Sequence, residues 1–130
     1  MIEQTDLIIS KWDYHPPANF IEAEEKLSSF IEFDVMKKRA PTKKGIACRF
    51  SCRFDFENET ILEYVAADTY VIDPEDIIDK NELHTMIRNS YSKFKEKFDL
   101  RKLGTVLRNT SLTPLDETKY DLDPVLALLK

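Results

Sequence analysis

Glycine is almost absent from this 130-residue sequence, in which Gly45 and Gly104 are the only two. Loops that cradle phosphate groups, and the Gly-x-Gly-x-x-Gly fingerprint of dinucleotide sites, need glycines so that the backbone can approach the ligand closely. The sequence therefore excludes both kinds of nucleotide site.

Cysteine and histidine are equally scarce, with two residues of each. At ~3.3 Å per residue along a strand, Cys48 and Cys52 would lie about 13 Å apart, whereas a disulfide needs Cα atoms within about 7 Å. Their spacing is not that of a Cys-x-x-Cys motif, and His15 and His84 form no metal-ligand pattern. We therefore expect two buried, unreactive thiols, no metal, no cofactor and no catalytic residue, so that the protein is not an enzyme.

The chain also lacks an excess of positive charge, because 24 acidic residues outnumber 19 basic ones and the net charge is -5. Nucleic-acid binding is driven by Lys and Arg side chains that neutralise phosphates, so the composition argues against a nucleic-acid partner. An acidic chain instead suits basic or unfolded polypeptide partners.

Long apolar runs are missing as well. No stretch approaches the ~20 apolar residues of a membrane span, and residues 1–6 lack the basic start and apolar core of a signal peptide. We expect a cytoplasmic protein with no membrane insertion. The length and the balance of 42% hydrophobic and 33% charged residues predict one globular domain that spans residues 1–130.

Two long strands are predicted at the centre of the chain. Apolar and polar residues alternate over residues 46–56, which places them on opposite faces of a strand. Residues 61–72 carry apolar side chains on both faces, so this strand is expected to need cover on both. The polar residues 57–60 are few enough for a hairpin turn between the two strands.

Two further strands are expected earlier, at residues 6–14 and 28–38, joined by a proline-containing crossover loop. The basic connection at residues 39–44 is expected to be a solvated turn, and a patch for an anionic partner is the alternative.

Helices are expected to follow the strands. Asp79 and Glu82 have the spacing of a capping box, and they precede a helix predicted for residues 80–103. Its apolar residues form one stripe at helical spacing, namely Leu83, Met86, Ile87, Tyr91, Phe94 and Phe98. Asp123 and Pro124 open a short C-terminal helix. This order predicts an α+β fold, a four-stranded antiparallel sheet with the long helix and the short C-terminal helix packed on one face.

Aromatic residues are plentiful by contrast: eight Phe, five Tyr and one Trp. Several fall where a four-stranded sheet and one long helix cannot cover both faces: Trp12, Tyr14, Phe30, Tyr64 and Tyr70. Surplus apolar surface implies an oligomer interface or a protein-binding groove. The alternative is that long charged side chains cover it.

The chain resembles the SecB family of bacterial export chaperones over nearly its whole length. Residues 29–35, Ser-Phe-Ile-Glu-Phe-Asp-Val, resemble the family's second strand, and residues 50–72 resemble its long hairpin. Residues 111–116, Ser-Leu-Thr-Pro-Leu-Asp, resemble the stretch before its last helix. Tyr91 and Ser92 stand where the family usually has a Phe-Pro pair, so a less broken helix is expected here.

The resemblance implies a molecular chaperone that binds unfolded or secretory polypeptides and keeps them from aggregating. It also implies a homotetramer built as a dimer of dimers, with either the export motor SecA or a toxin–antitoxin pair as a further partner. From another class, the alternative is a dedicated interaction or regulatory subunit that binds one folded partner or an antitoxin. An enzyme with a pocket between helix and sheet is the third alternative.

A chaperone needs an exposed apolar groove that accepts many sequences, lined by flexible and aromatic side chains. The residues expected to form this polypeptide-binding groove come from the first strand, the crossover loop and the long helix: Trp12, Phe20, Ile21, Met86 and Tyr91. The alternative is that each is an ordinary core or interface residue.

Overall fold

The computed structural model describes residues 2–17, 28–39, 44–73, 75–115 and 121–129. Its strands are β1 (Ile2–Gln4), β2 (Ile8–Tyr14), β3 (Ser28–Arg39), β4 (Lys44–Phe56) and β5 (Glu59–Ile72). All pairings are antiparallel, in the order β1-β5-β4-β3, and β2 also pairs with β5.

The first strand is split into two pieces that share one edge of β5. β1 pairs with the end of β5 at Tyr70–Ile72, and β2 pairs with its earlier part, from Leu62 to Ala67. The described sheet is therefore four strands wide, which confirms the predicted sheet. The expected strand at residues 6–14 is wrong at its start, because the pairing is interrupted between Gln4 and Ile8.

The turn of the central hairpin is as short as an antiparallel hairpin allows. Glu57 and Asn58 both have positive φ angles, 50° and 65°, as the two central residues of a type I′ turn do. The predicted turn is confirmed, although it uses two residues rather than four. Close to this turn, the pairing of β4 with β5 shifts register between Phe54 and Asp55.

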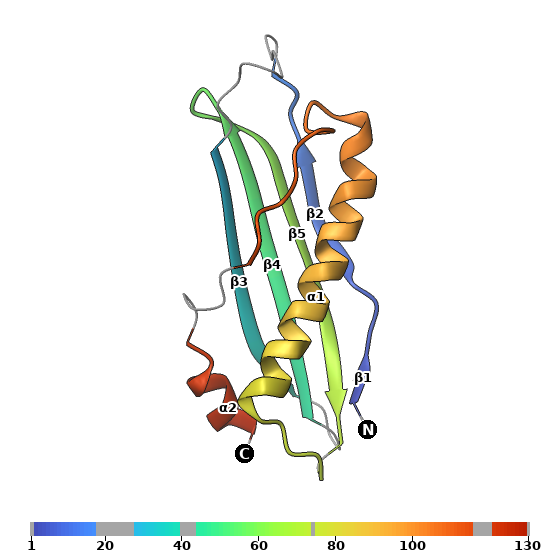
Figure 1. The fold of residues 1–130 in the computed structure, drawn as a ribbon, viewed down its shortest axis with the longest axis vertical. Coiled ribbons are helices and arrows are strands. Elements are labelled where there is room, and N and C mark those ends of the chain that lie inside the picture. The colour runs from blue at the N-terminus through green and yellow to red at the C-terminus, as the bar shows by residue number, and fades with distance from the viewer. Residues whose placement is uncertain (1, 18–27, 40–43, 74, 116–120, 130) are drawn as a thin grey trace.

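The helices are α1 (Lys80–Arg101), which continues into the 3-10 turn η1 (Lys102–Gly104), and α2 (Asp123–Leu129). The Asp79 side chain accepts a hydrogen bond from the Glu82 backbone N–H at 2.7 Å, so the predicted N-cap is confirmed. As expected, α1 runs unbroken through Tyr91. It crosses one face of the sheet obliquely and ends beside β2, while residues 109–115 return over β4 toward β3 (Figure 1).

The core lies between α1 and the sheet. Every residue of the predicted helix stripe is buried, opposite the alternating apolar residues of β4 and β5. At its centre the Tyr64 ring stacks on Phe94, with centroids 4.1 Å apart, and its hydroxyl donates to the Phe94 carbonyl at 2.9 Å. Because the sheet of the same chain covers this stripe, the stripe gives no reason to expect a partner subunit.

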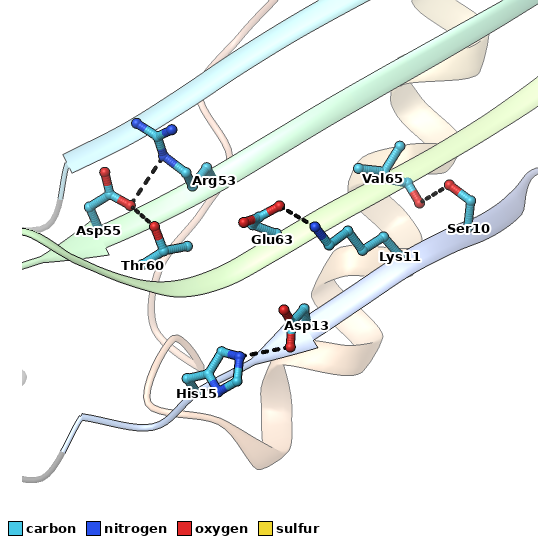
Figure 2. Close-up of polar contacts among 9 residues, drawn as sticks. All are labelled: Ser10, Lys11, Asp13, His15, Arg53, Asp55, Thr60, Glu63 and Val65. Atoms are coloured by element: carbon cyan, nitrogen blue, oxygen red, sulfur yellow. Dashed lines mark hydrogen bonds and ion pairs between the residues drawn. The ribbon is translucent and has the colours of Figure 1, made fainter.

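The other face of the sheet is covered differently. Val65, Ala67 and Val71 of β5 are half-buried on it, among charged side chains of the neighbouring strands. Lys11 of β2 reaches Glu63 at 2.5 Å, and the charged residues form a row across β4, β5 and β2 (Figure 2). On this face, therefore, long charged side chains supply part of the cover that β5 was expected to need.

We expect both cysteines to be unreactive in the folded protein. Burial raises the pKa of the Cys48 and Cys52 thiols to about 12, so the reactive thiolate is on the order of one part in 10,000 at pH 8. A thiol-specific colour reagent should label neither cysteine in native buffer and both in denaturant. Rapid labelling of the native protein would contradict the burial of β4.

The raised pKa values of the two thiols also predict that the folded protein loses stability at high pH. Thiols of the unfolded chain ionise near their ordinary pKa, whereas the folded thiols stay protonated up to about pH 12. Their contribution to stability is therefore complete at neutral pH and is lost as the pH rises from the ordinary value toward 12.

Candidate functional site

Two of the predicted groove residues lie inside the core. Met86 and Tyr91 are 5% and 6% exposed, and both belong to the buried stripe of α1. The Tyr91 ring packs against Phe50 with centroids 5.4 Å apart, and its hydroxyl donates to the Thr113 carbonyl of the returning segment. Within one chain these two residues pack as core residues, and their binding of a polypeptide stays a prediction.

Trp12 has a different environment. Its ring is half-buried at the end of β2 and makes an edge contact with Tyr64, with centroids 5.2 Å apart. On the α1 side, the Arg101 guanidinium lies 5.6 Å from the ring centroid, within the range of a cation–π contact. Phe20 and Ile21, which follow β2 in the chain, lie outside the described residues.

Two leucines are exposed next to Arg101. Leu100 is 67% exposed and Leu103 is 66% exposed, one at the end of α1 and the other in η1. We call Trp12, Leu100, Arg101 and Leu103 the tip surface. It lies at the end of the molecule where β2 ends and α1 ends (Figure 1), so it joins one predicted site residue to two apolar residues that the sequence reasoning missed.

The signal for those leucines was present in the sequence. The helix stripe has members at Phe94 and Phe98, and the next positions on the same face would be residues 101 and 102. Leu100 and Leu103 flank these two positions and are exposed, Leu100 at the end of α1 and Leu103 in η1. An apolar residue out of phase with a buried stripe is expected to be exposed.

The remaining large exposed apolar residues are scattered. Ile8 is 70% exposed on β2, and Ile77 is 87% exposed before α1. Phe30 on β3, 48% exposed, borders a shallow depression on the open face of the sheet, and the Arg53 guanidinium lies 4.6 Å from its ring centroid. Glu63 lines the same depression and is paired with Lys11 (Figure 2).

A polar cluster is buried between β5 and α1. The Ser90 hydroxyl donates to the Asp68 carboxylate, 2.8 Å from both of its oxygens, and Gln4 Nε2 donates to the same group at 2.7 Å. Asp68 is 2% exposed and Ser90 is fully buried. A substrate could not reach a carboxylate enclosed in this way, so its role is structural.

The described residues contain neither a metal-binding cluster nor a membrane-spanning helix. No three His, Cys, Asp or Glu side chains in that part of the chain are arranged to hold a metal ion. None of its helices is long and apolar enough to cross a membrane.

Comparison with solved structures identifies the architecture. A SecB-like chaperone from Mycobacterium tuberculosis, solved in complex with a ChAD peptide from the HigA1 antitoxin, is similar with a TM-score of 0.58 and 14% sequence identity. The match covers 89% of this chain and 91% of that chain. This chain has a SecB-like fold.

A second structure, a protein of unknown function from Streptococcus agalactiae, is 11% identical with a TM-score of 0.49. The match covers 89% of this chain and 97% of that chain. No protein-family model matches the sequence, and neither does any curated protein sequence.

Proposed function

We propose that this protein is a SecB-like chaperone that binds unfolded polypeptides and keeps them from aggregating, without catalysing a reaction. The observation that carries the proposal is the tip surface, where Leu100 and Leu103 are two-thirds exposed on either side of Arg101 in the chain, and Arg101 lies over the half-buried Trp12 ring. Its place on a SecB-like fold adds support.

Exposed apolar side chains are unfavourable in water, so their burial against a bound chain stabilises the complex. Burying one leucine contributes roughly 1.5–3 kcal/mol, so two exposed leucines can supply a binding energy that depends little on the sequence of the bound chain. A surface of this kind suits a partner that is itself an unfolded chain with exposed apolar residues.

The finer parts of the proposal follow from the resemblance. We propose a homotetramer in the cytoplasm, with precursor polypeptides and either SecA or a toxin–antitoxin pair as partners. The open face of the sheet and the outer edge of β2 are the surfaces that we propose for assembly, among the described residues.

The test is to dilute a denatured model protein into buffer with and without this protein and to follow light scattering. The wild type should suppress aggregation at a few-fold excess. The double variant Leu100→Asp, Leu103→Asp should raise the apparent Kd for the denatured client by about tenfold or more, because its apolar contact is lost.

Ile77→Asp is the matched control. Ile77 is also an exposed apolar residue, but it lies just before the first residue of α1, at the opposite end of the helix from the tip surface. It should keep wild-type suppression and the wild-type oligomer mass. If the wild type suppresses nothing at a several-fold excess, the general chaperone function is wrong.

The second candidate is a dedicated subunit that binds one partner, such as an antitoxin. It is favoured by one observation: the Mycobacterium tuberculosis protein with this fold was solved with an antitoxin peptide bound. A toxin–antitoxin pair encoded beside this gene, together with binding to that antitoxin and no suppression of general aggregation, would select this candidate.

A further inference from the structure

Charge is segregated along α1. Residues 93–108 carry six basic and two acidic side chains, a local charge of +4 in a chain whose net charge is -5. Residues 73–82, at the other end of the helix, carry five acidic side chains and one basic one. The tip surface therefore lies at the basic end of α1 in an acidic protein.

The helix dipole does not account for this excess. Cations stabilise only the last turn of a helix, which here holds Arg101, whereas Lys93 and Lys95 lie well before it. Over the described residues, neither of these two lysines has an ion-pair partner in the structure. Lys97 donates to the Leu7 carbonyl at 2.7 Å, a contact that leaves its charge uncompensated by an acid.

We propose that the tip surface selects acidic segments of client polypeptides that also carry an apolar side chain. This inference rests on the proposed function and names its substrate class. Leu100 and Leu103 would take the apolar side chain, and Lys93 and Arg101 would attract the carboxylates around it. Lys93 and Leu100 are seven residues apart, two helical turns, and so share one flank of α1.

The acidic end of α1 does not cancel this attraction, and Asp13, which follows Trp12 in β2, lies 2.8 Å from His15 on the open face of the sheet (Figure 2). The acidic end of α1 is separated from the tip by the length of a 22-residue helix, about 33 Å. Charges beyond the Debye length of about 10 Å are largely screened at 0.1 M salt. The local charge at the tip surface therefore decides the preference, and it is opposite in sign to the preference for basic clients that the net charge suggested.

A polypeptide fits this surface better than an anionic membrane does. Helices that lie on membranes bury a whole apolar face in the lipid, but the apolar stripe of α1 is already buried against the sheet. Two leucines remain, which is enough for one or two side chains of a bound segment.

The experiment uses three 12-residue peptides that share the same leucines and one uncharged dye and differ only in having Glu, Gln or Lys at the intervening positions. By fluorescence anisotropy at low salt, the Glu peptide should bind the full-length protein about tenfold more tightly than the Lys peptide. The difference should shrink as salt is added. Equal affinities, or tighter binding of the Lys peptide, would overturn the inference.

Lys93→Glu should weaken the Glu peptide about threefold or more and strengthen the Lys peptide, a change of sign that simple loss of structure would not produce. Lys80→Glu makes the same charge change at the first turn of α1 and should leave both affinities within about twofold. The last measurement is binding of the protein to vesicles of phosphatidylserine and phosphatidylcholine. If the protein bound these anionic vesicles but not the Glu peptide, the inference would be wrong and the ligand of the tip surface would be a lipid surface.

The two proposals fail separately in these assays. Suppressed aggregation without a preference for the Glu peptide removes the inference and leaves the chaperone function. Preference for the Glu peptide without suppressed aggregation removes the general chaperone function and identifies the tip surface as the site for an acidic dedicated partner.

Discussion

Replacing Tyr64 with alanine is expected to lower the free energy of unfolding by about 4 kcal/mol, as large-to-small changes at aromatic core sites do. Tyr64 is fully buried at the centre of the interface between the sheet and α1. Its ring stacks on Phe94, lies 5.2 Å from Trp12 and 6.2 Å from Phe98, measured between centroids. The alanine would leave a cavity between β5 and α1, and urea denaturation followed by far-ultraviolet circular dichroism measures the loss.

Tyr64→Phe is the matched control, because it keeps the ring and removes only the hydroxyl that donates to the Phe94 carbonyl. That carbonyl already belongs to the helix, so the cost should be about 1 kcal/mol. If Tyr64→Ala cost no more than Tyr64→Phe, the ring stack would not be what holds α1 on the sheet.

Much of this core could be predicted from two simple periodicities. The alternation over residues 46–56 placed one set of β4 side chains inside, and the helical spacing from Leu83 to Phe98 placed the stripe of α1. Both patterns depend only on local geometry, and a buried face on each element leaves one way to assemble them. In the type I′ turn, asparagine tolerates the positive φ at Asn58, whereas Glu57 adopts a positive φ without that advantage.

Other features depend on contacts between distant residues, and no local pattern contains them. The split of the first strand into β1 and β2 reflects where β5 offers partners, with Thr5 held to Thr69 between the two pieces. Met86 and Tyr91 were expected in a groove because a chaperone groove needs flexible and aromatic side chains. Within one chain, the sheet and the returning segment near Leu112 bury both of them.

The candidate site was predictable only in part, for a similar reason. Trp12, one of the surplus aromatic residues, lies half-buried beside Arg101, and its role in binding a polypeptide stays a prediction. Leu100 and Leu103 were not predicted, because helical periodicity identifies only those apolar residues that share one buried face of the helix. Phe20 and Ile21 lie outside the described residues, so their part in the site stays a prediction.

The polar cluster of Asp68 and Ser90 interrupts both periodic patterns at the place where they meet. Asp68 stands on the buried face of β5 between Ala66 and Tyr70, and Ser90 stands on the buried face of α1. Each residue alone places a polar group on an otherwise apolar face. The hydrogen bond from Ser90 to Asp68 gives both groups a partner, and it fixes the position of α1 along β5.

Ser90→Ala is therefore expected to lower the free energy of unfolding by about 3 kcal/mol, although it removes a single oxygen atom. A buried carboxylate that loses a donor bears a desolvation cost larger than that of a neutral group. Gln4 Nε2 would be the donor that remains among the hydrogen bonds described for Asp68. Urea denaturation at pH 7 measures the change.

The double variant Asp68→Ala, Ser90→Ala separates this explanation from a simple loss of packing. Removing both partners also removes the buried charge, so the double variant should cost at least 1 kcal/mol less than the sum of the two single variants. Tyr70 supplies a reference within the same cluster: its hydroxyl donates to the Met86 carbonyl at 2.8 Å and lies 3.0 Å from Ser90 Oγ. Tyr70→Phe should cost about 1 kcal/mol. Strictly additive losses for Asp68 and Ser90 would mean that the two residues do not stabilise each other, and that the position of α1 along β5 is set by the apolar stripe alone.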